Sequence, residues 1–407
     1  MSVSLIKKNN YSIHIIKLSN KFELTKENKK NFICLSISFK NNNMNEIKKA
    51  NKLIFGIIKK ILLTISLIVS TISLATAQDN DIASFQKRKN AENAYNKGIS
   101  YVKDLKYNDA IKSFTEAINQ MPNHCKAYLQ RGKARYHNND KDGAFSDISK
   151  AIKCDTTNGE AYFYLGYLQL ITDTSSVKIE NFNKAIEKGF THPDAYYYRG
   201  VAKFYKNDIQ GAQMDFTNSI EKKGNNKNAY FDRGITKLLL KDFQGAINDF
   251  KQALFLDSTM IAAYNNIAYA KIKSSDFQNA LNDLNSIIKS QPKNYIAYNN
   301  RALAKFYLND LDGAKEDLKM AISLKQDYLP AFVNMSIVLS KSGDQNAAID
   351  QLNKAVQINS KVVEIYVNRG CIKELMGDID GACADWNAAA SAGYKEAEKY
   401  VNECQNK

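Results

Sequence analysis

Hydrophobic positions along this chain recur with the spacing of amphipathic helices. In residues 297–322, Tyr298, Ala302 and Phe306 lie four residues apart, which places them on one face of an α-helix. A second apolar face follows with the spacing i, i+4, i+7 and i+8, and it consists of Ala314, Leu318, Ala321 and Ile322. The stretch is therefore predicted to form two short amphipathic helices.

The same pattern returns every 34 residues without an insertion. One column of small residues marks the period, and its members are Gly98, Gly132, Gly166, Gly200, Gly234, Ala268, Ala302, Ser336 and Gly370. Small side chains at these positions let two helices approach closely. Nine repeats are predicted over residues 91–396, and residues 397–407 are predicted to form a closing helix over the last apolar face.

A polar turn of the form Asn-Asp, Lys-Asp or Gly-Asp separates the two helices of most repeats. The aspartate is placed to accept hydrogen bonds from the free amide groups at the start of the second helix. We expect this capping role for Asp208, Asp242, Asp276, Asp310, Asp344 and Asp378.

A 34-residue helix pair with these columns resembles the tetratricopeptide repeat, and the resemblance covers three quarters of the chain. It implies an all-α fold, in which antiparallel helix pairs stack into a right-handed superhelical solenoid whose first helices line a concave groove. Each repeat would bury its apolar face on its neighbours. Repeat three departs most from the pattern, with Lys178 where other repeats hold alanine, and we expect a local loosening there.

Charged residues on the two helices are coupled across the repeats. Three residues after the small-residue column, six repeats hold a base, and the same six hold an aspartate twelve residues later. The pairs are Arg135 with Asp147, Lys203 with Asp215, Lys237 with Asp249, Lys271 with Asp283, Lys305 with Asp317 and Lys373 with Asp385. A second base lies one helical turn earlier, at Arg131, Arg199, Arg233, Arg301 and Arg369. We expect salt bridges that fix the register of the helix pair, although common descent of the copies would also produce the coupling.

Five cysteines follow residue 77. Cys125 and Cys154 stand at opposite ends of the two helices of repeat two, and an antiparallel pair brings such ends together. Cys383 and Cys404 lie in the last repeat and in the closing helix. Both pairs are candidate disulfides, with Cys371 left over, and the alternative is that all five are small buried apolar residues.

The first 77 residues differ from the rest in charge. The chain carries a net charge of +15, and this segment contributes +10 of it through 13 lysines against three acidic residues. The remaining charges are interspersed, so nucleic-acid binding is not expected. Residues 1–43 are interpreted as an extension upstream of a true start at Met44, or as a genuine disordered extension.

Residues 44–77 have the order of a secretory signal peptide. Lysines come first, an apolar run over 61–74 follows, and Ala75, Thr76 and Ala77 end the segment. We expect cleavage after Ala77, a short linker over 78–90, and export to the periplasm or cell surface. The alternative is an uncleaved membrane anchor, although a span needs about 20 apolar residues.

The sequence contains no phosphate-binding loop, nucleophile elbow or zinc-protease motif, so neither an enzyme nor a cofactor is expected. A metal site from His124, Cys125, His137 and Cys154 is also not expected. Twelve residues of helix between Cys125 and His137 span about 18 Å, too far for one ion.

We expect an exported scaffold that binds a protein or an extended peptide in the concave groove. Repeats three to five offer aromatic residues on their first helices, namely Phe163, Tyr164, Tyr167, Tyr197, Tyr198, Tyr205 and Phe231. Repeats six to nine offer amides, namely Asn265, Asn266, Asn299, Asn300, Asn334 and Asn368. The aromatic side chains could instead pack between adjacent first helices, and the amides could face solvent or connect adjacent repeats. A structural spacer without a groove ligand is the alternative function, and a chaperone-like assembly factor is one form of the scaffold.

Overall fold

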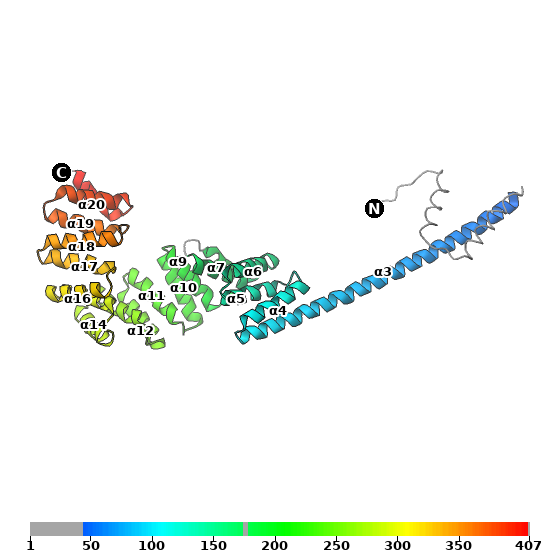
Figure 1. Cartoon of the computed structure of the whole chain (residues 1–407), viewed down its shortest axis with the longest axis horizontal. Helices are drawn as coiled ribbons and strands as arrows, with labels where there is room; N and C mark the ends of the chain where they lie inside the picture. Colours follow the sequence, from blue (N-terminus) through cyan, green and yellow to red (C-terminus); the bar gives the residue numbers. More distant parts are fainter. Residues whose placement is uncertain (1–43, 174–177, 406–407) are drawn as a thin grey trace. The chain divides into compact units, whose positions relative to one another are not determined.

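The computed structural model describes residues 44–173 and 178–405, and all regular elements in these ranges are helices (Figure 1). The interpretation of residues 1–43 lies outside the described residues. The chain divides into two compact units, residues 1–90 and residues 91–407.

The N-terminal unit consists, in its described part, of helix α3 (Met44–Lys103), whose last turns belong to the second unit. The segment Lys48–Ile72 is long and apolar enough to cross a membrane by length and composition, and its side chains are not buried. This segment of 25 residues is longer than the expected run over 61–74, because it includes Lys59 and Lys60.

From residue 91 onward the described helices form nine pairs in chain order, and consecutive helices pack against one another (Figure 1). The first pair joins the end of α3 to α4 (Tyr107–Gln120). The other pairs are α5 (Cys125–His137) with α6 (Lys141–Cys154), α7 (Gly159–Thr172) with α8 (Ile179–Glu187), α9 (Pro193–Tyr205) with α10 (Ile209–Lys222), α11 (Lys227–Leu239) with α12 (Phe243–Leu256), α13 (Ile261–Lys273) with α14 (Phe277–Ser290), α15 (Tyr295–Tyr307) with α16 (Leu311–Leu324), α17 (Leu329–Lys341) with α18 (Gln345–Ile358), and α19 (Val363–Leu375) with α20 (Ile379–Ser391).

Contacts between alternate helices identify the inner layer of this stack. Among the described helices they are most extensive between first helices of adjacent repeats, namely α7 with α9, α13 with α15, α15 with α17, and α17 with α19. Helices on the inside of a curved stack approach their neighbours more closely than those outside. The predicted all-α superhelical solenoid is therefore confirmed, with first helices inside and second helices outside.

The stack ends in a short 3-10 helix, η3 (Lys395–Ala397), and in α21 (Glu398–Gln405), and both contact α20. Trp386 on α20 stacks on Tyr400 of α21 with ring centroids 4.9 Å apart. This contact covers the apolar end of the last repeat. In repeat three, α8 has only nine residues and begins at Ile179, after the segment 174–177 that lies outside the described residues.

The turns between the paired helices, apart from that of repeat three, whose residues 174–177 lie outside the described part, share one backbone conformation. The residue before the capping aspartate has a positive φ, 64° at Lys241 and 64° at Asn309. Asparagine and glycine tolerate this left-handed region best, which explains why they are frequent there. Aspartate then accepts a hydrogen bond from the third residue of the helix at Asp140, Asp208, Asp242, Asp310, Asp344 and Asp378. Asp276 differs from the expectation, because its carboxylate accepts hydrogen bonds from the side chain of Asn279 instead.

The size of each side chain in the small-residue column is matched to the size of the side chain sixteen positions later. A Cβ atom built on Gly234 would lie 2.6 Å from the ring of Phe250, and one on Gly370 would meet Trp386. Where the column holds Ala268, the opposing residue is the smaller Leu284, and the two lie in one buried cluster. A larger side chain on one helix therefore goes with a smaller one on the other, which keeps the distance between the paired helices.

Candidate functional site

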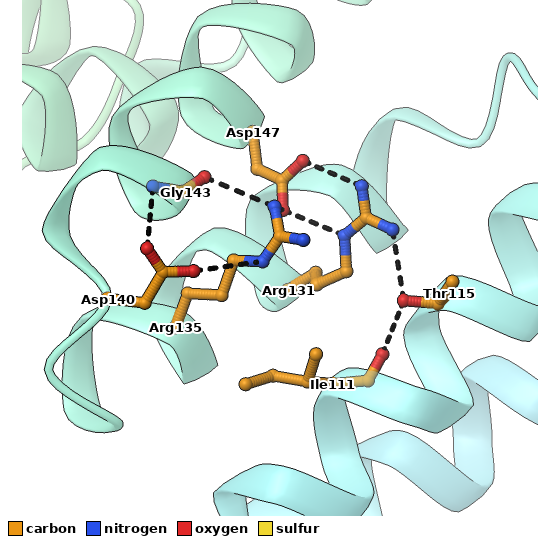
Figure 2. Close-up of polar contacts among 7 residues, drawn as sticks. All are labelled: Ile111, Thr115, Arg131, Arg135, Asp140, Gly143 and Asp147. Atoms are coloured by element: carbon orange, nitrogen blue, oxygen red, sulfur yellow. Dashed lines mark hydrogen bonds and ion pairs between the residues drawn. The ribbon is translucent and has the colours of Figure 1, made fainter.

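A polar cluster at the junction of repeats one and two centres on Arg131 of α5 (Figure 2). Its Nε and Nη2 atoms each donate to a carboxylate oxygen of Asp147 at 2.7 Å. Its Nη1 atom donates to the hydroxyl of Thr115 at 3.0 Å, and that hydroxyl donates to the carbonyl of Ile111. Asp147 and Thr115 belong to the second helices of consecutive repeats. One guanidinium therefore joins three helices, and we call this arrangement an arginine bridge.

Four further arginine bridges repeat this geometry. In each, the guanidinium makes two hydrogen bonds to an aspartate sixteen residues later and one to an asparagine or threonine sixteen residues earlier. The arginines are Arg199, Arg233, Arg301 and Arg369, and the earlier partners are Asn183, Thr217, Asn285 and Asn353. Paired hydrogen bonds of this kind are strong and directional.

The lysine or arginine one turn later completes each bridge. Arg135 lies 2.7 Å from Asp147, and the corresponding lysines lie 2.8 to 2.9 Å from theirs. Burial alone would raise the pKa of Asp385, but the hydrogen bonds from Arg369 and Lys373 outweigh it and hold that pKa below its usual range. The charges of the bridges are thus satisfied inside the protein, which favours a structural role.

The threonine or asparagine partner was missed in the sequence analysis, although a signal exists. The position sixteen residues before each bridging arginine holds threonine or asparagine. The corresponding position before Leu165, Ile267 and Met335, which replace the arginine, holds Ser149, Lys251 and Lys319.

Among the repeats after the first, three lack the arginine, and each fills its place differently. Repeat three replaces the charged pair by a neutral one, in which the amide of Asn181 donates to Gln169 at 2.8 Å. Repeat eight holds Gln351 in place of the acid, and Met335 fills the arginine position in a buried cluster. Repeat six alone among the described repeats after the first keeps the acid, Asp283, beside its lysine without the arginine.

A row of tyrosines crosses the first helices of repeats two to four. The hydroxyls of Tyr136 and Tyr167 lie 2.8 Å apart, and the rings of Tyr167 and Tyr198 meet edge to face at 4.7 Å. Burial and the hydrogen bond with Tyr167 raise the pKa of Tyr136 to about 12. Since these side chains are only half-buried, the row forms part of the inner surface.

The other aromatic candidates differ widely in exposure. Phe163 is only 5% exposed and packs against Phe182 and Phe190, whereas Tyr205 is 59% exposed at the end of α9. Tyr164 lies half-buried, with the Lys133 ammonium 4.9 Å from its ring centre. Phe231 lies half-buried against Phe250. Tyr164, Tyr167, Tyr198 and Tyr205 therefore present surface that a partner can reach.

First helices of adjacent repeats touch through residues that are 35 positions apart. The Tyr197 hydroxyl donates to Asp232 at 2.8 Å. In later repeats amides make the same connection, and the two hydrogen bonds run from Asn300 to the carbonyl of Asn265 and from Asn334 to Asn299. Asn300 is 6% exposed, so its amide serves the contact between repeats.

Asn266 and Asn368 are half-buried, and neither side chain makes a hydrogen bond to another described residue. Burial raises the pKa of Asp232, which holds the Asn266 position in repeat five, to about 6, although the hydrogen bond from Tyr197 acts in the opposite direction.

Two disulfides connect the expected cysteines. Cys125 is joined to Cys154 with α-carbons 5.5 Å apart, and Cys383 to Cys404 with α-carbons 5.9 Å apart. The first closes repeat two, and the second fastens α21 to α20. Cys371 is a free thiol. No three His, Cys, Asp or Glu side chains gather into a metal-binding group within residues 44–173 and 178–405.

Comparison with known proteins agrees with this geometry. A profile of the tetratricopeptide repeat family matches residues 95–161 and 265–327. A tetratricopeptide repeat protein from Parabacteroides merdae ATCC 43184 superposes with a TM-score of 0.50 at 15% identity, covering 63% of this chain and 98% of that one. Yeast Tom70 gives a TM-score of 0.47 at 16% identity, covering 78% of this chain and 96% of that one. No curated protein sequence matches the chain.

The nine helix pairs, their 34-residue period and the family match define the class. The chain is a tetratricopeptide repeat protein.

Proposed function

We propose that this protein is a non-catalytic interaction scaffold that binds a protein or an extended peptide on its inner, first-helix surface. The observation that carries the proposal is the row of Tyr136, Tyr167 and Tyr198, which crosses three consecutive first helices and remains half-exposed. Tyrosine offers large contact area with little rotamer entropy to lose, so it dominates many protein interfaces.

The partner lies along the inner surface, with apolar side chains against the tyrosine row and the exposed Tyr205. Asn266 supplies both a donor and an acceptor for the partner backbone. Since the bridging bases of repeats two, four and five are occupied by their own aspartates, binding depends weakly on salt.

We further propose that the protein acts outside the cytoplasm. The apolar segment Lys48–Ile72 is suited to a signal peptide or an anchor, and the two disulfides suit an oxidising compartment. Fractionation of cells that produce the full chain, with intact-mass analysis, tests this proposal. A cytoplasmic chain with reduced cysteines would contradict it.

Site-specific crosslinking in cells tests the binding surface. A photo-reactive phenylalanine analogue replaces Tyr205, which is 59% exposed on the first-helix side, and Phe255, which is 84% exposed on a second helix, in separate variants. The partner is expected to crosslink from position 205 and not from position 255. Crosslinking from 255 alone would place the partner on the outer surface, and no partner at either position would favour the structural spacer.

Affinity measurements with the crosslinked partner complete the test. Replacing Tyr167 and Tyr205 by alanine together should weaken binding at least tenfold, which corresponds to about 1.4 kcal/mol. Unchanged affinity in a variant with native helix content would contradict the role of the tyrosines.

A further inference from the structure

A cavity of about 740 Å³ opens between the second helices α12 and α14. Its lining includes Lys251 and Leu254 from α12, Tyr264, Ile267 and Lys271 from α13, and Asp283 from α14. The cavity therefore lies at the junction of repeats five and six, on the layer of second helices. It is separate from the tyrosine row of the first helices.

The cavity occupies the place where other repeats hold an arginine bridge. Ile267 stands at the arginine position, Asp283 sixteen residues later at the acid position, and Lys251 sixteen residues earlier at the threonine or asparagine position. An isoleucine side chain ends at Cδ1 and carries none of the three nitrogens of a guanidinium, so the space that a guanidinium fills elsewhere is open here.

The receptor groups for a guanidinium nevertheless remain. In all five bridges the guanidinium carbon lies 5.4 to 5.7 Å from the ring centre of the tyrosine three residues before the arginine. Repeat six keeps this residue as Tyr264, and 39% of it is exposed. A flat ring beside a carboxylate suits a planar cation.

The carboxylate of Asp283 is accessible in a way that the others are not. Its side chain is 37% exposed, against at most 6% for the acids of the five bridges. Lys271 contacts its Oδ2 atom at 2.5 Å, and no other described residue donates a hydrogen bond to it. In the bridges, a carboxylate holds the corresponding base and a guanidinium together, so Lys271 leaves room for a second donor.

We propose that this cavity binds the side chain of an arginine from a partner protein. The guanidinium donates two hydrogen bonds to Asp283 and lies over Tyr264, and its methylene groups pack on Leu254 and Ile267. The site thereby reproduces the arginine bridge between two molecules. A lysine side chain, which is a point donor without the planar fork, fits this receptor less well.

Lys251 weakens the site without closing it. The bridges hold a neutral acceptor at this position, whereas Lys251 is an exposed cation. Replacing it by asparagine removes the repulsion and restores the acceptor seen in Asn183 and Asn285. The variant Lys251→Asn should bind arginine about twofold to fivefold more tightly than the natural chain.

Saturation-transfer NMR on the full chain tests the proposal with blocked amino acids as probes. N-acetyl-arginine amide should bind saturably in the millimolar range, and N-acetyl-lysine amide several times more weakly. Asp283→Asn should weaken arginine binding at least about tenfold. Ile267→Arg fills the cavity from within and should abolish binding, while leaving the fold intact.

Each other outcome overturns the proposal. The first three are no saturable binding of the arginine probe, equal binding of the two probes, and undiminished binding to Ile267→Arg. The fourth is a preference for N-acetyl-glutamate amide, which would show that the site binds an anion. Free L-arginine binding more tightly than the blocked probe would assign the site to the amino acid and not to a protein side chain. Met214→Ala serves as the control and should leave arginine binding unchanged, because Met214 is exposed on α10 and does not line the cavity.

Discussion

Repeats five and six are adjacent and have helices of equal length, yet they fill the space between helices in different ways. In repeat five Gly234 lies against the ring of Phe250, whereas in repeat six Ala268 lies against Leu284. The summed volume of the two side chains changes little between the two repeats. Packing between paired helices therefore tolerates exchange when a compensating residue is sixteen positions away.

The polar contacts do not compensate in this way. Repeat five has a complete arginine bridge from Arg233 to Asp249, whereas repeat six holds Ile267 and keeps Asp283 exposed to solvent. An apolar core can be refilled by neighbouring methyl groups, but a carboxylate needs a donor or water. The carboxylate of repeat six therefore has no arginine partner from its own chain, whereas the carboxylate of repeat five already has one.

The largest effect is expected from converting the bridge of repeat five into the arrangement of repeat six. Arg233→Ile removes three hydrogen bonds and leaves Asp249, only 5% exposed, with Lys237 alone. The free energy of local unfolding should fall by about 3 kcal/mol. Hydrogen exchange of the α11 and α12 amides measures this change directly, because a long repeat array need not unfold in one step.

The matched variant in repeat six is Asp283→Asn, for which a loss below about 1 kcal/mol is expected, since this acid is exposed and singly paired. Equal losses in the two repeats would contradict the distinction between a closed bridge and an open receptor.

A smaller loss is expected from Gly234→Ala. The new Cβ would meet the Phe250 ring at 2.6 Å, and overpacking of this kind costs about 2 kcal/mol. Adding Phe250→Leu copies the pair of repeat six and should recover most of the loss. Thermal unfolding monitored by circular dichroism compares the single and double variants. A double variant less stable than Gly234→Ala would show that the two positions are not coupled.

Asp232 makes repeat five sensitive to pH, whereas repeat six has Asn266 at the same position. The folded-state pKa of Asp232, about 6, lies above the usual value of 3.8, so the folded chain binds this proton more tightly than the unfolded chain. The resulting stabilisation is fully present below the usual pKa and is lost as the pH rises through 6. Asp232→Asn should remove this dependence and raise the stability at pH 8 by about 1 kcal/mol. Unfolding curves recorded from pH 4 to 8 give the free energy of unfolding at each pH. If its dependence on pH is the same in Asp232→Asn as in the natural chain, the assignment is wrong.

The smallest effect concerns the turn before the cap. Lys241 adopts a φ of 64° in repeat five, and Ser275 adopts the same φ in repeat six. Lys241→Gly and Ser275→Gly should each stabilise the turn by about 0.5 kcal/mol, because glycine adopts this conformation without steric cost. Protection of the first amides of α12 and α14 reports the gain. A gain in only one repeat would mean that the flanking residues, and not φ, control the turn.

Local signals in the sequence predicted most of the architecture. The 34-residue period, the small-residue column and the aspartates before each second helix depend on contacts within one repeat, where spacing along the chain determines distance in space. For the same reason the pairing of Lys203 with Asp215, and of its equivalents, could be read from residues twelve positions apart. Even there Asp276 departs, because a neighbouring Asn279 competes for its carboxylate.

Burial could not be read from residue type on the first helices. Phe163 and Tyr205 were equivalent candidates in the sequence, yet one is enclosed by α8 and the following loop and the other is largely exposed. The asparagines divide in the same way, with Asn300 inside a contact between repeats and Asn266 half-exposed. Exposure depends on how adjacent repeats are rotated against one another, which no single repeat encodes.

By itself, the sequence determined the repeat, its helix pairs, their caps and the charges that join them, because these follow from periodicity within 34 residues. Only the tertiary structure decided that each arginine also reaches the previous repeat, through partners such as Thr115 and Asn183. It alone decided that Ile267 leaves a cavity beside Asp283. The physical reason is that these contacts join second helices of consecutive repeats, whose separation is set by the stacking of whole repeats.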